Sequence, residues 1–294
     1  SHNSSCFFLS LCDYFSICQK EDRSNHKSLC KAIIKEKKRL AVDAKQTSKL
    51  TTPEDLATEL IRAATKDNIV TVKRLLKQRK KVPFDVNFST TKLKVYGQHD
   101  HNRSIHLRSG EGADFTNALM MACEYSFIGI VNRLLMEKDI DINKQFNENN
   151  NNGETALFAA CQSNNLQIVN RLLQEKAIDI NLATNFITTE QGRPGFFGIN
   201  PLLMASYMGH VRVVDRLLQE KGTININQST EHGIDALMMA CQQGHSKVVK
   251  RLLREIDTIE DINRQSEAGT ALSIAKQFRH KAIVRMLKSA GATQ

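Results

Sequence analysis

One stretch near the C-terminal end of the chain, Asp235–Asn263, reads DALMMACQQGHSKVVKRLLREIDTIEDIN and decides the fold. It opens with small and apolar residues, continues with Val-Val and Leu-Leu pairs, and closes with Asp-Ile-Asn. The small residues predict a short helix that its neighbours approach closely, and the Val and Leu pairs predict a longer amphipathic helix. The tail alternates polar and apolar residues, which is typical of an extended segment.

The same three-part unit recurs along the chain, which is the sequence signature of a stacked-repeat architecture. The first pattern is found at Asn117–Cys123, Thr155–Cys161, Asn200–Ala205, Asp235–Cys241 and Thr270–Ala275. The second is found at Ile130–Leu135, Ile168–Leu173, Val213–Leu218, Val248–Leu253 and Ile283–Leu287. A weaker copy of the unit runs from Thr58 to Asn87. Since no single unit buries its apolar face alone, we expect six copies to stack into a solenoid.

These patterns resemble the ankyrin repeat, whose family pattern runs Thr-Pro-Leu-His-x-Ala-Ala, then Gly-His, Val-Val-x-Leu-Leu-Leu and Asp-Val-Asn. The resemblance covers roughly residues 54–294 and implies an all-α solenoid of about six helix-turn-helix repeats with short β-hairpin fingers. Gly-His is kept only at Gly209-His210 and Gly244-His245. The first histidine of the family pattern is replaced, so we expect its hydrogen bonds between repeats to be missing. The residues in its place are Met120, Phe158, Leu203, Met238 and Ser273.

The spacing of the copies divides the chain into two parts. We expect a helical N-terminal segment or cap at 1–50, or the remainder of an upstream domain, and a repeat domain at 51–294. Thr52-Pro53 marks the start of the first repeat helix, with Thr52 at the N-cap and Pro53 at the first helical position. Against a period of about 33 residues, the fingers are lengthened by insertions at 88–112 and 183–197. The repeats are expected near 53–87, 113–143, 151–181, 198–227, 233–263 and 268–294.

Composition and charge narrow the class of protein. The 294 residues include 41% hydrophobic residues, 7 Cys, and 41 Lys+Arg against 31 Asp+Glu. The apolar share is that of a globular protein, and the odd cysteine count favours a reducing, cytoplasmic compartment over a disulfide scaffold. Residues 113–263 are net acidic and 264–294 are net basic, so the total of +10 is not a uniform nucleic-acid footprint. The apolar run Cys6–Cys18 is too short to span a bilayer, and we expect no membrane span.

Candidate metal and nucleophilic residues each have a simpler interpretation. Zinc sites prefer cysteines two to four residues apart, and Cys6, Cys12, Cys18 and Cys30 are not spaced in that way. We interpret them, and the three cysteines at 123, 161 and 241, as small buried helix residues. Searches for hydrolase, metalloprotease and nucleotide-binding motifs find none, so we expect no enzyme activity and no cofactor. Since the chain begins Ser1-His2 without an initiator Met, we treat it as a possible fragment.

Two basic segments leave alternatives open. His99, His101 and His106 lie among Lys and Arg residues of the first insertion, where a metal site, a solvated loop and a docking loop for an acidic or phosphorylated partner are all possible. The run Lys77–Lys81 resembles a nuclear-localisation or nucleic-acid patch. It also falls at a helix C-terminus, where cations are favoured by the helix dipole, and we favour that interpretation.

The resemblance implies a binding strip. Ankyrin proteins usually meet their ligands on the concave face, which is formed by the fingers and by two residues after the Ala-Ala pair of each first helix. Aromatic and Met side chains gather there in the fourth repeat, and such residues are typical interface anchors. The predicted partner-binding residues are Glu124, Tyr125, Gln162, Phe196, Phe197, Ile199, Tyr207, Met208, His232, Gln242, Gln243 and Phe278. Phe196 and Phe197 have an alternative role, which is to cover their own finger.

The sequence therefore predicts a monomeric, non-enzymatic module that binds another protein on its concave face. Its Ile-, Asn- and Lys-rich, His-poor repeats are similar to those of ankyrin proteins from intracellular bacteria, which implies a secreted effector acting on host proteins. One alternative is the substrate-recruiting part of a larger enzyme whose catalytic domain lies outside this chain. Another is a nucleic-acid or anionic-surface binder that uses the basic ends.

Overall fold

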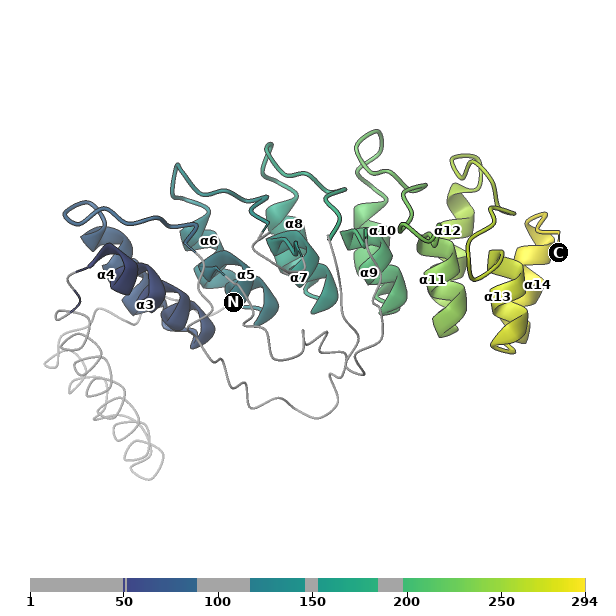
Figure 1. Ribbon diagram of the computed structural model, residues 1–294, viewed down its shortest axis with the longest axis horizontal. Helices are drawn as coiled ribbons and strands as arrows, with labels where there is room; N and C mark the ends of the chain where they lie inside the picture. The colour runs from purple at the N-terminus through teal and green to yellow at the C-terminus, as the bar shows by residue number, and fades with distance from the viewer. Residues whose placement is uncertain (1–49, 51, 89–116, 146–152, 185–197, 294) are drawn as a thin grey trace, which may run out of the picture. The chain divides into compact units, whose positions relative to one another are not determined.

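The computed structural model describes residues 50, 52–88, 117–145, 153–184 and 198–293 (Figure 1). The chain divides into two compact units, Ser1–Thr51 and Thr52–Gln294, and the helices described here belong to the second unit. The helical segment predicted for 1–50 lies outside the described residues except for Leu50. None of the described helices is long and apolar enough to cross a membrane.

Helices in the second unit follow one another as antiparallel pairs, which confirms the all-α repeat architecture. The first helix of each pair packs against the first helix of the next pair, and the second helices do the same (Figure 1). The first helices are α3 (Pro53–Thr65), α5 (Ala118–Glu124), α7 (Ala156–Gln162), α9 (Pro201–Tyr207), α11 (Ala236–Gln243) and α13 (Ala271–Gln277). The second helices are α4 (Ile69–Gln78), α6 (Ile128–Leu134), α8 (Leu166–Leu172), α10 (Val211–Leu217), α12 (Ser246–Leu252) and α14 (Lys281–Ser289). A 3-10 turn, η2 (Leu253–Glu255), extends α12.

Side-chain caps explain where the first helices begin. The Thr52 hydroxyl accepts a hydrogen bond from the backbone N–H of Asp55 at 3.1 Å, and Pro53 is the first helical residue, as the sequence predicted. The equivalent residue of every later first helix caps it through the N–H three positions on. A short polar side chain therefore fixes the start of each repeat.

The core lies where the small residues of the first helices meet the Val and Leu pairs of the second helices. Cys123, Cys161 and Cys241 are 0% exposed, so their interpretation as buried core residues is confirmed. Burial raises the pKa of each thiol well above its usual range, which keeps all three protonated. Apolar side chains at the family's histidine position, including Phe158 and Leu203, are buried as well.

The fingers differ from the predicted β-hairpins. No strand is found in the described parts of the fingers, where the only β pairing consists of the isolated bridges Ser229–Asp235 and Ser266–Gly269. The reason is local, because a side chain in each tail accepts a hydrogen bond from the N–H two residues on and closes a turn. Asp179 does so for Asn181 at 2.9 Å, and Asp85, Asp141, Asn225 and Asp261 do the same in the other tails.

A row of asparagines, here called the asparagine ladder, joins each finger to the next. The side chain of Asn181 donates to the backbone carbonyl of Thr223 at 2.7 Å and accepts from the backbone N–H of Asn225 at 2.8 Å. Each bond crosses a repeat boundary, so the ladder fixes the spacing of successive fingers. Both kinds of bond recur at Asn87, Asn143 and Asn227, and Asn263 accepts from the N–H of Thr293.

Candidate functional site

The described part of the predicted strip lies where the first helices end. In the repeats from α5 onward the same two positions recur there, the seventh and the eighth residue after the N-cap of the first helix. Below, "the strip" means Glu124, Tyr125, Gln162, Tyr207, Met208, Gln242, Gln243 and Phe278. Each of these side chains is half-buried or exposed, and Phe278 is 45% exposed. The helix stack therefore presents them in register along one edge of its first helices.

Aromatic side chains on the strip are held by stacking. The rings of Tyr125 and Phe127 lie 6.0 Å apart between centroids with 16° between their planes. The rings of Phe278 and His280 lie 6.3 Å apart with 10° between their planes. In both repeats the second ring belongs to the residue that precedes the second helix. The first ring is thereby oriented while part of its face stays accessible, as an interface anchor requires.

Tyr207 and Met208 end α9 and are half-buried. Burial raises the pKa of Tyr207 above its usual value, and burial together with the neighbouring Glu124 raises that of Tyr125 to about 12. Both phenols are therefore neutral at physiological pH and keep a hydroxyl that can donate or accept. Each offers an apolar ring with a polar end, which is the composition favoured at protein interfaces.

Histidines fix the backbone of the strip from the following repeat. The Nε2 atom of His245 is 2.8 Å from the carbonyl oxygen of Tyr207, and His210 and His280 make the same contact with Gln162 and Gln242. The two Gly-His pairs in the sequence indicated the first two of these residues. His280 was missed because Arg279, with a φ of 60°, stands where the motif has glycine.

Two of the predicted contact residues that the structure describes lie elsewhere than on this row. Ile199 is only 4% exposed and lies in the core next to the cap of α9, so its prediction as a contact residue is wrong. His232 is 2.8 Å from Glu267 of the next finger, so it already has a partner within the chain. Phe196 and Phe197 fall outside the described residues, as do the histidines of the 88–112 insertion.

Charged residues at the end of α4 have structural roles. Lys77 lies in the last turn of α4, and Arg79 caps that helix. The guanidinium of Arg79 donates to the carbonyl of Phe84 at 2.7 Å and pairs with Glu137 and Asp139 of the next repeat. The hydrogen bond from Arg79 lowers the pKa of Asp139 below its usual value. This basic run therefore contributes an inter-repeat ion pair as well as a helix-end charge.

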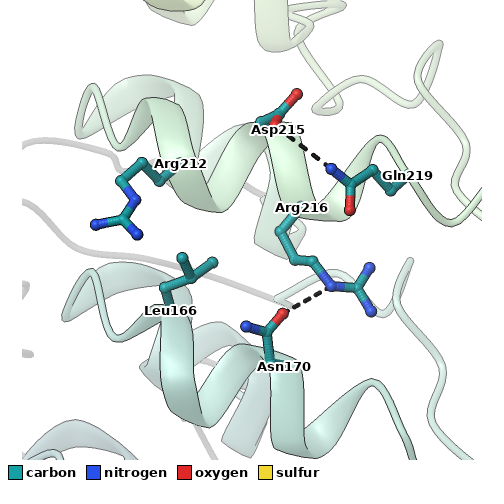
Figure 2. Close-up of a pocket in the computed structure, with 6 residues that line it drawn as sticks. All are labelled: Leu166, Asn170, Arg212, Asp215, Arg216 and Gln219. Carbon is teal, nitrogen blue, oxygen red and sulfur yellow. Dashed lines mark hydrogen bonds between the residues drawn. The ribbon is translucent and has the colours of Figure 1, made fainter.

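On the second helices, a depression of about 370 Å³ lies between α8 and α10 (Figure 2). In its wall, Arg216 Nε donates to Asn170 Oδ1 at 2.7 Å. Asp215 accepts from Gln219 at 3.4 Å and from Arg251 Nε at 2.5 Å. Most polar groups of the wall are thus engaged with one another. The depression is lined by Leu166, Asn170, Arg212, Asp215, Arg216 and Gln219.

No cluster of three or more His, Cys, Asp or Glu with the arrangement of a metal site occurs among the residues that the structure describes. The described cysteines are buried thiols with raised pKa values, which are poor nucleophiles. The side chains of the strip offer apolar contact, hydrogen bonding and stacking.

Comparisons with known proteins agree with this architecture. A family model described as ankyrin repeats (3 copies) matches residues 17–184, 180–265 and 202–294. Among solved structures, the crystal structure of the human ASB11 ankyrin repeat domain is similar, with a TM-score of 0.55. The sequence identity is 22%, over 80% of this chain and 84% of that one, so the likeness concerns the fold alone. A search of curated proteins finds no match.

Proposed function

The chain belongs to the ankyrin-repeat family, and we propose that it is a non-enzymatic module that binds a partner protein through the strip. Ankyrin repeats are generally protein-interaction modules, which supports the general function. The proposal adds to this general function that the strip is the contact surface. We also propose that the protein acts as a monomer in a reducing, cytoplasmic compartment. The buried free thiols support this choice of compartment.

The observation that carries the proposal is the register of Tyr125, Tyr207, Met208 and Phe278. Tyr125, Met208 and Phe278 occupy the equivalent position directly after their first helices, and Tyr207 is the last residue of α9. None of the four side chains is fully buried. A side chain needed only for the core would be buried, as its neighbours Cys123 and Ala205 are. Hot spots of interfaces are enriched in aromatic residues on preorganised backbone, and the histidine contacts supply that preorganisation.

Action on host proteins as a secreted bacterial effector is a further part of the proposal and rests only on the resemblance of the repeats. It predicts that the captured partner is a protein of a host cell rather than of the same organism. The strip proposal does not depend on it, since the same side chains are presented whatever the partner.

The test compares proteins captured from cell lysates by the immobilised chain and by two variants. Tyr207→Ala combined with Phe278→Ala removes two anchors from the strip while leaving the backbone carbonyl of Tyr207 for His245. Each central anchor contributes about 2 kcal/mol, or roughly 30-fold in affinity, so we expect the captured partner to be lost. Met136→Ala is the matched control, because Met136 is 74% exposed and lies after a second helix.

We expect Met136→Ala to capture the same proteins as the unmodified chain. Far-UV circular dichroism establishes that both variants remain folded. An unchanged set of partners with the double variant would show that the strip is not the contact surface. The molar mass measured by light scattering at the working concentration tests whether the protein is a monomer. The mass of a dimer would contradict that part of the proposal.

A further inference from the structure

Exposed cations gather on the outer face of α12 and α14. In α12 and the turn that follows it, they occupy positions i, i+3 and i+7, which share one side of a helix. In α14 they occupy positions i, i+4 and i+7, which do so too. The two helices are in contact as neighbours (Figure 1). Below, "the cationic face" means Lys247, Lys250, Arg254, Lys281, Arg285 and Lys288.

None of these six side chains has an ion pair or a hydrogen bond to another residue that the structure describes. Two acidic groups near them, Glu255 and Asp215, are already engaged, because both accept from Arg251. The cationic face is therefore uncompensated from within the described chain. Like charges at these helical spacings destabilise a helix, and an acidic partner would relieve that repulsion.

Of the preceding second helices, α4 carries one row of exposed cations, Lys73, Lys77 and Lys80, whereas α6, α8 and α10 carry no such row. From α8 to α12, one arginine in each second helix donates to an acceptor on the second helix before it. Arg171 donates to Asn132 at 3.0 Å, Arg216 to Asn170 at 2.7 Å and Arg251 to Asp215 at 2.5 Å. Each of these arginines also pairs with a glutamate four residues on. We call this set the arginine ladder.

The arginine ladder ends between α12 and α14. On α12, the residue that corresponds to the acceptor Asp215 is Lys250. On α14, the residue that corresponds to the donor Arg251 is Met286, so neither the acceptor nor the donor of a further bond is present. The charge pattern therefore changes from paired to single-sign at the point where the cationic face begins. The last two repeats differ from α4 in that their two rows lie on neighbouring helices that are in contact.

We propose that the cationic face binds an acidic segment of a partner protein, independently of the strip. Each row of cations extends over seven residues of helix, or about 10 Å, and packed helices lie about 8–10 Å apart. An acidic helix laid on the cationic face, along α12 and α14, would place carboxylates within reach of both rows. Two turns of such a helix match the length of the face.

A short acidic segment fits better than a nucleic acid or a membrane. A duplex carries a charge about every 1.7 Å and would continue past the face, over α10 and the fingers. A peripheral membrane site also needs an apolar anchor, and the exposed large apolar side chains of the described chain, Val70, Met136 and Phe278, do not belong to α12 or α14.

The experiment measures binding of a fluorescein-labelled Glu/Ala peptide of about 14 residues, long enough to form a helix, by fluorescence anisotropy. A Gln/Ala peptide of the same pattern is the uncharged control. Duplex DNA and vesicles containing phosphatidylserine are measured beside them. We expect binding of the Glu/Ala peptide at low salt, weakening as salt is raised, and little binding of the other three probes.

The decisive variant is Lys250→Glu with Arg285→Glu, which reverses one charge in each row. We expect it to weaken peptide binding by about tenfold or more. Lys176→Glu with Lys221→Glu changes the net charge equally at exposed finger positions, and we expect about twofold or less from it. A neutral pair, Lys250→Gln with Arg285→Gln, should weaken peptide binding to an intermediate degree. It tests the same two positions if the charge-reversed pair does not fold.

Three results would overturn the proposal. The first is equal weakening by the face pair and the finger pair, which would mean that only net charge matters. The second is tighter binding of DNA or vesicles than of the Glu/Ala peptide, which would assign the face to those partners instead. The third is no peptide binding at low salt. Because Tyr207→Ala should leave peptide binding unchanged, failure of the strip proposal and failure of this one are distinguishable.

Discussion

Replacing Asn181 by alanine tests whether the asparagine ladder holds the repeats together. Asn181 follows α8, and its side chain makes two bonds to the finger that follows α10, one to Thr223 and one to Asn225. Its backbone does not have a positive φ, so alanine introduces no strain. The backbone bond from its own N–H to Asp179 is also kept. The change therefore removes the inter-repeat side-chain bonds and little else.

The expected loss follows from those two bonds. A neutral hydrogen bond contributes about 1 kcal/mol net, which sets the upper value at about 2 kcal/mol for the pair. Thr223 and Asn225 are exposed, so water replaces part of what is lost. We expect the free energy of unfolding to fall by about 1 to 2 kcal/mol. Asn181→Asp keeps the acceptor for Asn225 and loses the donor to Thr223, so its loss should be close to that of the single donor.

The assay is urea unfolding followed by far-UV circular dichroism at several final concentrations. In a solenoid, stability is shared between repeats and the interfaces that join them, so a weakened interface lowers the midpoint and broadens the transition. Asn225→Ala is the matched control, since that side chain accepts from Asn227 within its own finger. Equal effects of Asn181→Ala and Asn225→Ala, or no effect of Asn181→Ala, would refute the inter-repeat role.

Two further predictions concern Gly209 and Asp235. A Cβ atom at Gly209, where φ is +75°, would lie 2.6 Å from the ring of His245, whereas one at Gly222, where φ is +84°, meets nothing within 4 Å. Thermal unfolding should therefore show a loss of about 1 kcal/mol for Gly222→Ala and about 2 to 3 kcal/mol for Gly209→Ala, and equal losses would contradict the histidine contact. Burial raises the pKa of Asp235 above its ordinary 3.8, so its ionised form is disfavoured in the fold and stability falls as pH rises through the folded pKa. Asp235→Asn keeps the cap for Met238 and should raise the midpoint at pH 7, with the gain vanishing below pH 3.8; a gain that persists in acid would refute this cause.

The helix pairs were predictable because their signal is local and repeated. Small residues, Val and Leu pairs and capping side chains each act within one repeat, and the recurrence multiplies that signal. The tails were predicted less well. Their alternating Ile and Asp residues favour a strand, but each Asp or Asn side chain closes a turn on its own backbone, and the strand does not form.

The site was predictable only in part, because its geometry depends on neighbouring repeats. The end of each first helix could be read from the sequence, and with it the positions of Tyr207 and Phe278. The burial of Ile199 could not, because the core around the cap of α9 is assembled by tertiary packing. The partners of Asn181 lie 42 and 44 residues away along the chain, so spacing alone did not reveal the ladder.

Three sets of hydrogen bonds cross the repeat boundaries, each at a different part of the repeat. The asparagine ladder joins the fingers, the histidines join the ends of the first helices, and the arginine ladder joins the second helices. These bonds use backbone groups and side chains that belong neither to the strip nor to the cationic face, so the side chains of those two surfaces take no part in joining the repeats. Tyr207 on the strip and Arg285 on the cationic face are both positions of this kind. We expect a change at either to alter binding with little change in the free energy of unfolding, whereas a change at Asn181 should alter stability first. Such a separation would support the proposal that the two surfaces serve recognition, and a large loss of stability at either would contradict it.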